Sequence, residues 1–378
     1  MVLLQSVSPK SWQVIMSTRS RKTLVLFADK LPPATGGVES HGKYLIEHFG
    51  KHPAYELHII TKDTAGQDIV IQEGKSPQVA NKCTMRQLVV DVVFYNSGAW
   101  IEHLSLHKKI WPQAKYVYRT GGNEIVKAPL VDHFIYEHSA RQRYWIEQLN
   151  ATIDILITNS RFTEQRLQAL GITCKLTKVV GGAYSCPVQK SIRTIPLFVS
   201  AARFVPYKNH QLLIEVFHTL HQHGFEYRLK LYGDGALFST IEQLVRSYKL
   251  QDKIELLGAV DNRLVCREIA QADCYVQLSQ DIPTKVPGGS YLHTEGMGRS
   301  ILEAIAANTF VIAGKAGALD EIVTSNNGIL LDLKHQATIV QTILELGQRP
   351  PLVSNNVDYS WEGVFAKYDS IFSQICGF

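Results

Sequence analysis

Several features that mark special classes of protein are missing from this 378-residue chain. Its six cysteines form no C-x-x-C pair and no metal-ligand spacing, which excludes a disulfide scaffold and a zinc module and is typical of reduced thiols in a cytosolic protein. No apolar run approaches the ~20 residues of a membrane-spanning helix. Pro9, Lys10 and Trp12 interrupt the first 22 residues and no small-residue cleavage pattern follows, so we expect an irregular leader over 1–22 rather than a signal peptide.

Charge is modest and unevenly divided along the chain. The apolar and charged fractions, 45% and 19%, are those of a packed globular protein. Residues 1–190 hold 23 Lys and Arg against 15 Asp and Glu, a net charge of +8, whereas residues 191–378 hold 16 against 19, a net charge of −3. The basic half indicates an anionic partner, such as a lipid surface or a phosphorylated acceptor, although an ordinary solvated face explains it equally well. We expect no nucleic-acid partner.

Short apolar runs rich in β-branched and aromatic residues alternate with longer helical patterns. They cover 23–29, 55–61, 88–95, 115–120 and 153–159, and then 195–204, 227–235, 253–260, 272–279 and 309–315. This alternation predicts βαβ units with buried parallel sheets, and the length predicts two domains of roughly 150 to 200 residues. Because the pattern breaks near 181–195, we predict an α/β protein of two doubly wound domains. Their ligand is expected in the cleft at the carboxyl ends of the strands.

The stretch "HTEGMGRSILEAIA" (293–306) places two acids eight positions apart. Gly296 and Gly298 predict that Glu295 lies on a tight loop, and the apolar pattern from Ile301 predicts a helix with Glu303 near its N-terminus. Free N–H groups at a helix N-terminus attract anions, so the stretch indicates a polar, negatively charged ligand. Two alternatives remain at this point: ordinary surface glutamates, and an acid pair for hydrolysis.

Two further loops follow the first strand of each predicted domain. Gly36 and Gly37 in "PATGGVESHGKYLIEHF" (33–49) allow backbone N–H groups to approach a phosphate, although most such pairs are merely turns. Arg203 and Lys208 flank a proline-containing turn in "AARFVPYKNHQLLIEVF" (201–217). Paired cations suit a diphosphate, and their position at the edge of the predicted sheet favours binding over simple solvation.

These motifs, in this order, resemble those of the retaining glycosyltransferases of family 4, the group 1 glycosyltransferases with the GT-B fold. The likeness extends over about residues 23–378 and includes "ILITNSRFTEQRL" (155–167), "YGDG" (232–235) and a closing segment, "NVDYSWEGVFAKYDSIF" (356–372). It implies two facing Rossmann-like domains, at 23–185 for the acceptor and 190–355 for the nucleotide sugar, with an interdomain cleft. Residues 356–378 are then a helix that crosses back onto the first domain.

The resemblance also implies roles for individual residues. Glu295 accepts hydroxyls of the donor sugar, Glu303 holds the ribose, and Arg203 and Lys208 hold the diphosphate. The remaining donor-binding residues that it implies are Gly36, Gly37, Ala259, Val260, Gly296, Met297, Gly298, Arg299 and Ser300. In the family's front-face mechanism the departing phosphate takes the acceptor's proton, so no cofactor and no metal is expected. The chain has no D-x-D pair to hold a metal.

Two departures from the family pattern stand out. Where many members carry a histidine that contacts the donor sugar, this chain reads "RTGGNE" (119–124), which leaves Arg119, Gly121, Asn123 and Glu124 as alternative sugar or acceptor contacts. "VVGGAYSC" (179–186) replaces an asparagine-glycine turn at an expected interdomain hinge, a change that we interpret as neutral.

The acceptor side carries the weakest signals. Stretches 99–113 and 134–149 interleave aromatic and aliphatic residues with basic ones, which fits peripheral contact with an anionic membrane or an ordinary amphipathic helix packed on the sheet. The sequence thus predicts a cytoplasmic glycosyltransferase at the inner face of the cell membrane, with a UDP- or GDP-linked sugar donor and a glycan or lipid-linked acceptor, acting in bacterial surface polysaccharide or lipopolysaccharide assembly. The alternatives are an inactive nucleotide-binding partner subunit and a GT-B sugar-nucleotide epimerase.

Overall fold

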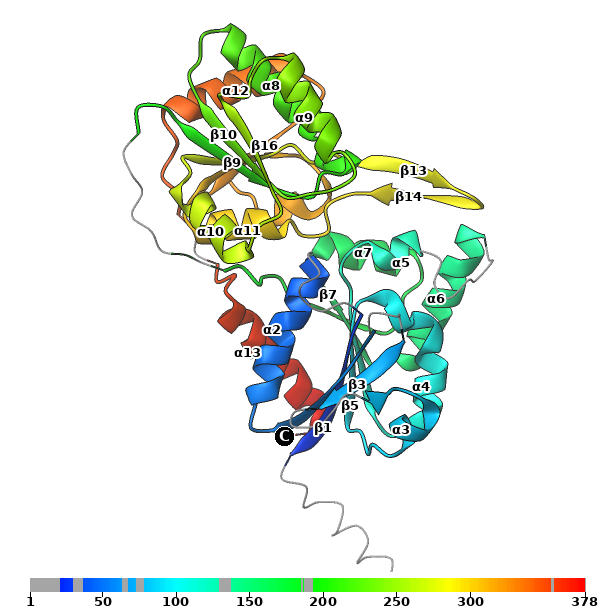
Figure 1. Ribbon diagram of the computed structural model, residues 1–378. Coiled ribbons are helices and arrows are strands. Elements are labelled where there is room, and N and C mark those ends of the chain that lie inside the picture. The colour runs from blue at the N-terminus through cyan, green and yellow to red at the C-terminus, as the bar shows by residue number, and fades with distance from the viewer. Residues whose placement is uncertain are drawn as a thin grey trace, which may run out of the picture.

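Two sheets organise the chain in the computed structural model (Figure 1). The structure describes residues 21–29, 37–62, 67–72, 78–128, 137–184, 186, 193–354 and 357–377. The predicted leader up to residue 20 and the candidate phosphate contact Gly36 lie outside the described residues. Within them, no helix is long and apolar enough to cross a membrane.

The first sheet has eight strands in the order β4-β3-β2-β1-β5-β6-β7-β8. Strands β3 and β4 are antiparallel additions at one edge and the other pairings are parallel. The strands are β1 (Lys22–Ala28), β2 (Tyr55–Lys62), β3 (Asp68–Gln72), β4 (Gln78–Val79), β5 (Val92–Asn96), β6 (Lys115–Arg119), β7 (Ile155–Thr158) and β8 (Lys175–Lys178). The helices of this half are α2 (Gly37–Lys51), α3 (Lys82–Arg86), η1 (Gly98–His103), α4 (Leu104–Ile110), α5 (Glu124–Lys127), α6 (His138–Thr152) and α7 (Arg161–Ala169).

Alternate residues of β1 belong to different cores, because successive side chains of a strand point to opposite faces of the sheet. Val25 and Phe27 pack with the cluster that includes residues of η1, α4 and α6. Leu24 and Leu26 pack instead with α2 and with the last helix, α13 (Trp361–Cys376). Both faces are therefore covered, which explains why the central strands are continuous apolar runs.

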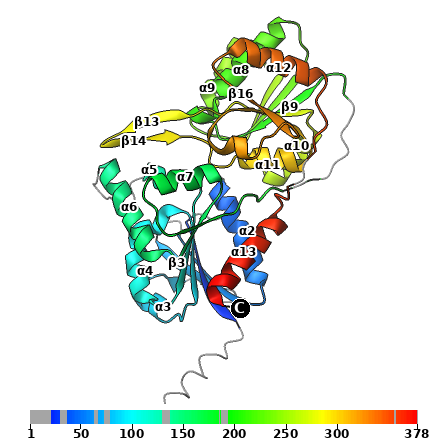
Figure 2. The same ribbon diagram turned by 180° about the vertical axis from the view of Figure 1, so that it is seen from behind.

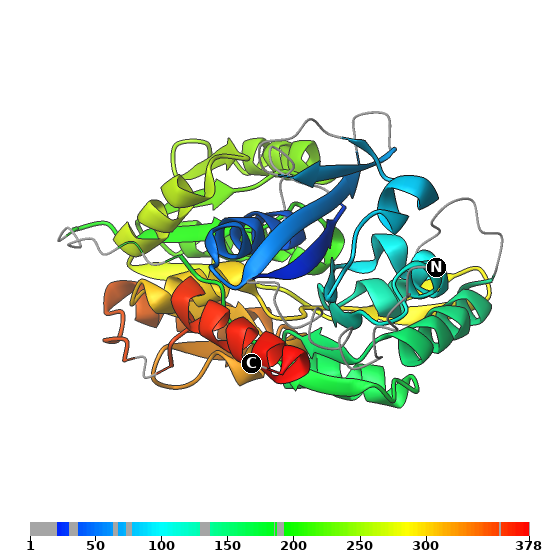
Figure 3. The same cartoon turned by 90° about the horizontal axis from the view of Figure 1, so that it is seen from below.

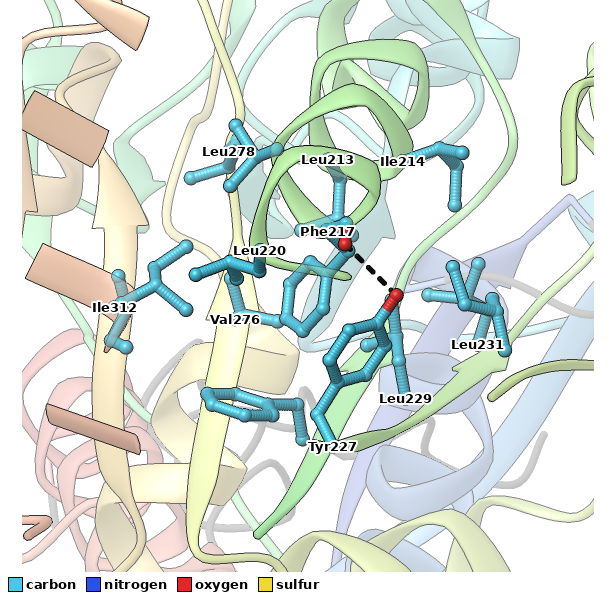
Figure 4. Packing of buried hydrophobic residues seen from close by; sticks show 14 of the residues in the cluster. Leu213, Ile214, Phe217, Leu220, Tyr227, Leu229, Leu231, Val276, Leu278 and Ile312 are labelled. Carbon is cyan, nitrogen blue, oxygen red and sulfur yellow. Dashed lines mark hydrogen bonds between the residues drawn. The ribbon is translucent and has the colours of Figure 1, made fainter. Parts of the chain in front are cut away.

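The second sheet has six parallel strands in the order β11-β10-β9-β12-β15-β16. They are β9 (Leu197–Ala201), β10 (Arg228–Tyr232), β11 (Ile254–Gly258), β12 (Cys274–Gln277), β15 (Phe310–Gly314) and β16 (Gly328–Leu331). Around them lie η2 (Pro206–Lys208), α8 (His210–Gln222), α9 (Phe238–Ser247), α10 (Asn262–Gln271), α11 (Arg299–Ala306), η3 (Gly317–Glu321) and α12 (Gln336–Gln348). In the core beneath α8, the Tyr227 hydroxyl donates a 2.9 Å hydrogen bond to the Phe217 carbonyl, which satisfies a buried polar group (Figure 4).

A two-stranded antiparallel hairpin, β13 (Ile282–Val286) and β14 (Gly289–His293), stands apart from both sheets. It extends from the second domain over α5 and α6 of the first (Figure 1).

The chain crosses twice between the domains, and the two crossings lie together. The backbone N–H groups of Gly182 and Ala183 both donate to the Tyr359 carbonyl, each at 2.9 Å. Helix α13 then lies beside α2 (Figure 1, Figure 2, Figure 3), where Trp361 stacks on Tyr44 with ring centroids 4.2 Å apart. The predicted C-terminal crossover helix is confirmed, although it begins at Trp361 rather than 356, because the Ser360 side chain caps it.

All ten strands predicted from the sequence are present, with ends shifted by a few residues. Six strands were not predicted: β3, β4, β8, β13, β14 and β16. Strands β3 and β8 carry no fully buried residue, so they lack the apolar run on which the prediction depended.

Candidate active site

Glu295 is buried, with 4% of its surface exposed, in the loop between β14 and α11. Its Oε1 atom accepts three hydrogen bonds: from Lys208 Nζ at 2.5 Å, from Ser279 Oγ at 2.7 Å and from Gln277 Nε2 at 3.0 Å. No hydrogen bond to Oε2 is formed by the residues that the structure describes. The carboxylate is thus fixed through one oxygen, which leaves the other for the hydroxyls of a ligand.

These partners come from the carboxyl ends of neighbouring strands. Lys208 ends η2, which follows β9, and Gln277 ends β12 with Ser279 two residues later. Burial by itself lowers the pKa of Lys208, but the Glu295 carboxylate outweighs it, and the net pKa is raised. Lys208 therefore stays cationic. A charged, preorganised pair thus stands where ligands bind in an open parallel sheet.

The first domain meets this loop directly. Asn123 Nδ2 donates to the Thr294 carbonyl at 2.9 Å. The backbones of Gly122 and Gly296 approach so closely that a Cβ on Gly122 would lie 3.2 Å from the Gly296 Cα. Asn159 supports the first-domain side by donating to the Gly121 carbonyl at 3.2 Å. Two of the candidates in "RTGGNE", Gly121 and Asn123, therefore lie at the Glu295 loop.

Arg119 and Glu124, the other two candidates there, bond within the first domain. Arg119 is buried, donates to Asn96 Oδ1 at 3.0 Å and hydrogen-bonds Tyr368 of α13. Glu124 Oε1 accepts from the Gly121 backbone N–H at 2.7 Å and from the Tyr118 hydroxyl at 3.0 Å. Arg119 thus contacts the crossover helix and Glu124 holds the turn at Gly121, and a contact of these two side chains with the sugar or the acceptor stays a prediction.

Glu303, on α11, is buried beside the N-terminus of α10. Its Oε1 accepts from Asn262 Nδ2 at 3.1 Å and lies 3.5 Å from Arg299 Nε. Burial raises the pKa of this carboxyl, and Arg299 acts in the opposite direction. Arg299 also donates to the Gly37 carbonyl at 3.4 Å, so it connects the surroundings of Glu303 to the first domain.

A third loop fixes the backbone of the catalytic candidate. Ala318 N–H donates to the Glu295 carbonyl at 3.0 Å. Gly317 precedes it with a φ of +50°, and a Cβ there would lie 2.1 Å from the same carbonyl oxygen. Glycine at 317 is required by both the backbone angle and the close approach.

The other predicted donor-binding residues surround these acids. Arg203 is exposed in the loop after β9, and Ala259 and Val260 follow β11. Ser300 Oγ hydrogen-bonds the Tyr275 hydroxyl at 2.8 Å, and Gly298 starts α11 in a left-handed conformation. Met297 packs partly against the second-domain core.

The stretches considered for membrane contact are packed inside the protein. Trp100, Leu104, Trp111, Trp145 and Leu149 are all buried in the first-domain core. The alternative interpretation, amphipathic helices packed on the sheet, is therefore correct for these residues. Residues 134–136 lie outside the described residues.

Sequence reasoning missed several side chains near the two acids. They are Asn262, Gln277, Ser279 and His293, and also Lys127, which lies beside Tyr291 of the hairpin. A usable signal was present for two of them, because Gln277 and Ser279 are polar residues at alternate positions where a buried strand ends. The others depend on contacts between elements that are distant in the sequence.

Among the described residues, one cluster has metal-ligand composition: His48, His52 and Asp369, between α2 and α13. His52 Nδ1 accepts from the Ala54 backbone N–H at 3.2 Å, which places the ring proton of the neutral imidazole on Nε2. That is the nitrogen that faces Asp369, at 3.8 Å, and His48 Nε2 hydrogen-bonds the same carboxylate oxygen at 2.8 Å. The arrangement fits a hydrogen-bonded fastening of α13 better than a metal centre.

Comparisons with known proteins agree with this architecture. Residues 188–359 match the family described as "Glycosyl transferases group 1". A GDP-mannose-dependent monoacylated alpha-(1-6)-phosphatidylinositol monomannoside mannosyltransferase of Corynebacterium glutamicum is 23% identical over 362 residues, which cover 88% of this chain and 90% of the relative. A related mannosyltransferase of Mycobacterium tuberculosis is 22% identical over 358 residues, 85% of this chain and 88% of the relative.

Among solved structures, Anabaena HepE in complex with UDP and glucose aligns with a TM-score of 0.67 and 16% identity, over 94% of this chain and 100% of that one. At that identity the likeness shows the fold alone. The match to the group 1 glycosyltransferases thus covers the second domain, and the whole chain has the GT-B fold.

Proposed function

We propose that this glycosyltransferase moves a sugar from a nucleotide-sugar donor to a glycan or lipid-linked acceptor, with retention of the anomeric configuration and without a metal. The observation that carries the proposal is the buried Glu295 carboxylate, held through Oε1 by Lys208, Gln277 and Ser279 at the domain interface. Its position supports a role in accepting hydroxyls of the donor sugar beside the reacting carbon.

Charge explains the proposed chemistry. As the bond between the sugar and the diphosphate breaks, negative charge grows on the phosphate oxygens and the sugar becomes oxocarbenium-like. Lys208 and the N-terminal N–H groups of α11 are fixed before the reaction, so they stabilise that charge at little reorganisation cost, and the exposed Arg203 adds a second cation. The acceptor hydroxyl then attacks from the face that the diphosphate leaves. Its proton passes to the departing phosphate oxygen, so retention requires no protein base.

Metal independence follows from the same cations, since they supply the charge that a divalent ion provides in other transferases. We expect transfer to persist in excess EDTA. Transfer that disappears in EDTA and returns with Mg²⁺ or Mn²⁺ would contradict this part of the proposal.

The names of the relatives indicate which classes of donor and acceptor to consider. The two mannosyltransferases are named for GDP-mannose and for phosphatidylinositol mannosides, whereas HepE was solved with UDP and glucose. We therefore propose a UDP- or GDP-linked hexose as donor, with the base near Ala259 and Val260. A lipid-linked acceptor places the enzyme at the cytoplasmic face of the membrane, in bacterial surface polysaccharide assembly.

The first test is a thermal-shift screen with UDP, GDP, ADP and their sugar conjugates, because a ligand of the folded state raises the melting temperature. Stabilisation by one nucleotide family selects the donor for a transfer assay. Nucleotide binding without release of nucleoside diphosphate would favour the inactive-subunit alternative, and an isomerised sugar nucleotide without transfer would favour the epimerase.

A further inference from the structure

The β13–β14 hairpin ties the Glu295 loop to the first domain. His138 N–H at the start of α6 donates to the Pro287 carbonyl at 3.1 Å, and Ser139 N–H donates to the Gly288 carbonyl at 3.3 Å. The His138 ring also stacks on Tyr291, with centroids 5.9 Å apart. Figure 1 shows the hairpin lying along this side of the domain interface. Because β14 ends two residues before Glu295, these contacts set the position of the site as well as of the hairpin.

The side chains at the base of the hairpin form a continuous group with Lys208 and Glu295. Lys127 Nζ, from α5, lies 5.9 Å from the Tyr291 ring centroid. The His293 ring packs 4.2 Å from that of Tyr207, and Lys208 Nζ lies 5.2 Å from the Tyr207 centroid. The group therefore contains one cation from the first domain and residues from two loops of the second.

Charge in this group is not balanced. Lys208 is paired with Glu295, but neither Lys127 nor Arg203 has an ion-pair partner within 4.0 Å among the described residues. Burial lowers the pKa of Lys127 and the nearby Arg203 lowers it further, while Glu124 acts in the opposite direction. Burial, Lys127 and Arg203 also lower the pKa of His293, to about 4, which leaves a neutral ring able to donate one hydrogen bond. Two cations without an ion-pair partner, one on each side of the domain interface and with a neutral donor beside them, attract an anion.

We propose that Lys127, Arg203 and His293 form a phosphate-binding subsite that the hairpin assembles across the domain interface. A phosphate group suits it because its oxygens point in several directions, so cations and a hydrogen-bond donor on separate elements can all reach it. This inference rests on the proposed function, in which phosphate has two sources: the diphosphate of the donor and a phosphate on the acceptor. Lys127 is the residue that this proposal adds to the donor-binding set. It belongs to the first domain, so it reaches the phosphate only when the two domains are together.

The test compares Lys127→Met, which keeps the length of the side chain and removes its charge, with Lys127→Arg, which keeps a cation. Lys109→Met, on the exposed side of α4, is the matched control. Calorimetric titration with UDP and GDP measures nucleotide affinity. A second titration with inorganic phosphate is run on protein saturated with the nucleotide that binds, and also on nucleotide-free protein. Thermal unfolding of each variant checks that it is folded.

Loss of about tenfold in nucleotide affinity for Lys127→Met, restored by Lys127→Arg and absent in the control, supports the subsite and identifies its anion as the donor diphosphate. Unchanged nucleotide affinity, with phosphate binding to the saturated parent protein that Lys127→Met abolishes, supports the subsite and identifies an acceptor phosphate. If neither nucleotide nor phosphate binding changes in a folded Lys127→Met protein, the subsite is wrong. Failure of the parent protein to bind any nucleotide argues instead against the proposed function, and phosphate titration of the nucleotide-free protein still tests Lys127.

Discussion

Lys208 donates a 2.5 Å hydrogen bond to Glu295 although the two residues are 87 positions apart in the chain. Both side chains are largely inside the protein, with 10% and 6% of their surface exposed. A buried ion pair is costly to break, because removing one partner leaves the other charge uncompensated. The second domain therefore holds the acid and the cation in a fixed relation before any ligand arrives.

Glu295→Gln should separate chemistry from binding. The amide keeps the size of the side chain but loses the charge, so we expect sugar transfer to fall at least about 100-fold. Affinity for the nucleoside diphosphate should change by less than about threefold, since that ligand lacks the sugar. Kinetics of transfer and calorimetry of nucleotide binding check the two parts, and transfer at the parental rate would show that Glu295 has another role.

Lys208→Met should weaken sugar transfer and nucleotide binding, and it should also lower the stability of the fold. It removes the proposed diphosphate contact and leaves Glu295 buried without its cation, so we expect a loss of about 3 kcal/mol in unfolding free energy. Lys253→Met is the control, because Lys253 pairs with an exposed glutamate, Glu226, in the same domain and should cost less than about 1 kcal/mol. Urea denaturation measures both, and equal losses in the two variants would contradict the prediction.

Glu303→Gln tests the ribose assignment. If the carboxylate accepts the ribose hydroxyls, the parent enzyme should bind a ribonucleoside diphosphate about tenfold more tightly than its 2′-deoxy counterpart. The variant should lose most of that preference, because its amide oxygen is a weaker acceptor. Paired titrations with the two nucleotides give the ratio directly. Parental discrimination in the variant would place the ribose elsewhere.

Gly317→Ala should disturb the site by displacing the backbone of Glu295. Its Cβ would lie 2.1 Å from the Glu295 carbonyl oxygen at a φ of +50°, so the loop has to move. Gly224→Ala is the control for backbone strain alone, since Gly224 has a φ of +74° and nothing within 4 Å of the added Cβ. We expect about 1 kcal/mol of destabilisation in the control and about 1–3 kcal/mol more at 317, together with reduced transfer. Similar stability and full transfer in both variants would show that the close contact relaxes freely.

The fold was predictable wherever burial and periodicity act together. Strands such as β5 and β12 are buried on both faces, so their apolar runs are visible in the sequence. Glu295, Glu303, Arg203 and Lys208 were predicted as site residues because glycines and strand ends mark their loops. The hairpin was not found, because its residues are half exposed and its position depends on bonds to α6.

Arg119 shows the limit of assigning a site from a motif. The sequence places it next to the site loop, and a cation there suits a sugar or phosphate. Whether it points to the interface or to α13 depends on Asn96 and Tyr368, which come from distant parts of the chain. The same limit hid Lys127 and His293, whose proximity depends on how the hairpin meets the first domain.

His210 lies next to the site and makes the stability of the folded protein depend on pH. Burial first, and then the Lys208 charge, lower its pKa from 6.5 to about 3, and its ring stacks on Phe204 at 4.0 Å. Above about pH 6.5 neither the folded nor the unfolded state is protonated at this ring. Between the two pKa values only the unfolded chain takes up the proton, so stability falls as the pH falls, by about 2 kcal/mol at pH 5.

His210→Phe keeps the stacked ring and removes the titrating group, so the loss of stability between pH 8 and pH 5 should shrink by about that amount. Urea denaturation of the parent and the variant at a series of pH values gives the two curves. Because Nδ1 of His210 has no hydrogen-bond partner among the described residues, the substitution leaves no new unsatisfied polar group on that side of the ring. Parallel curves would mean that the His210 ring takes up its proton equally in both states, against the burial seen in the structure.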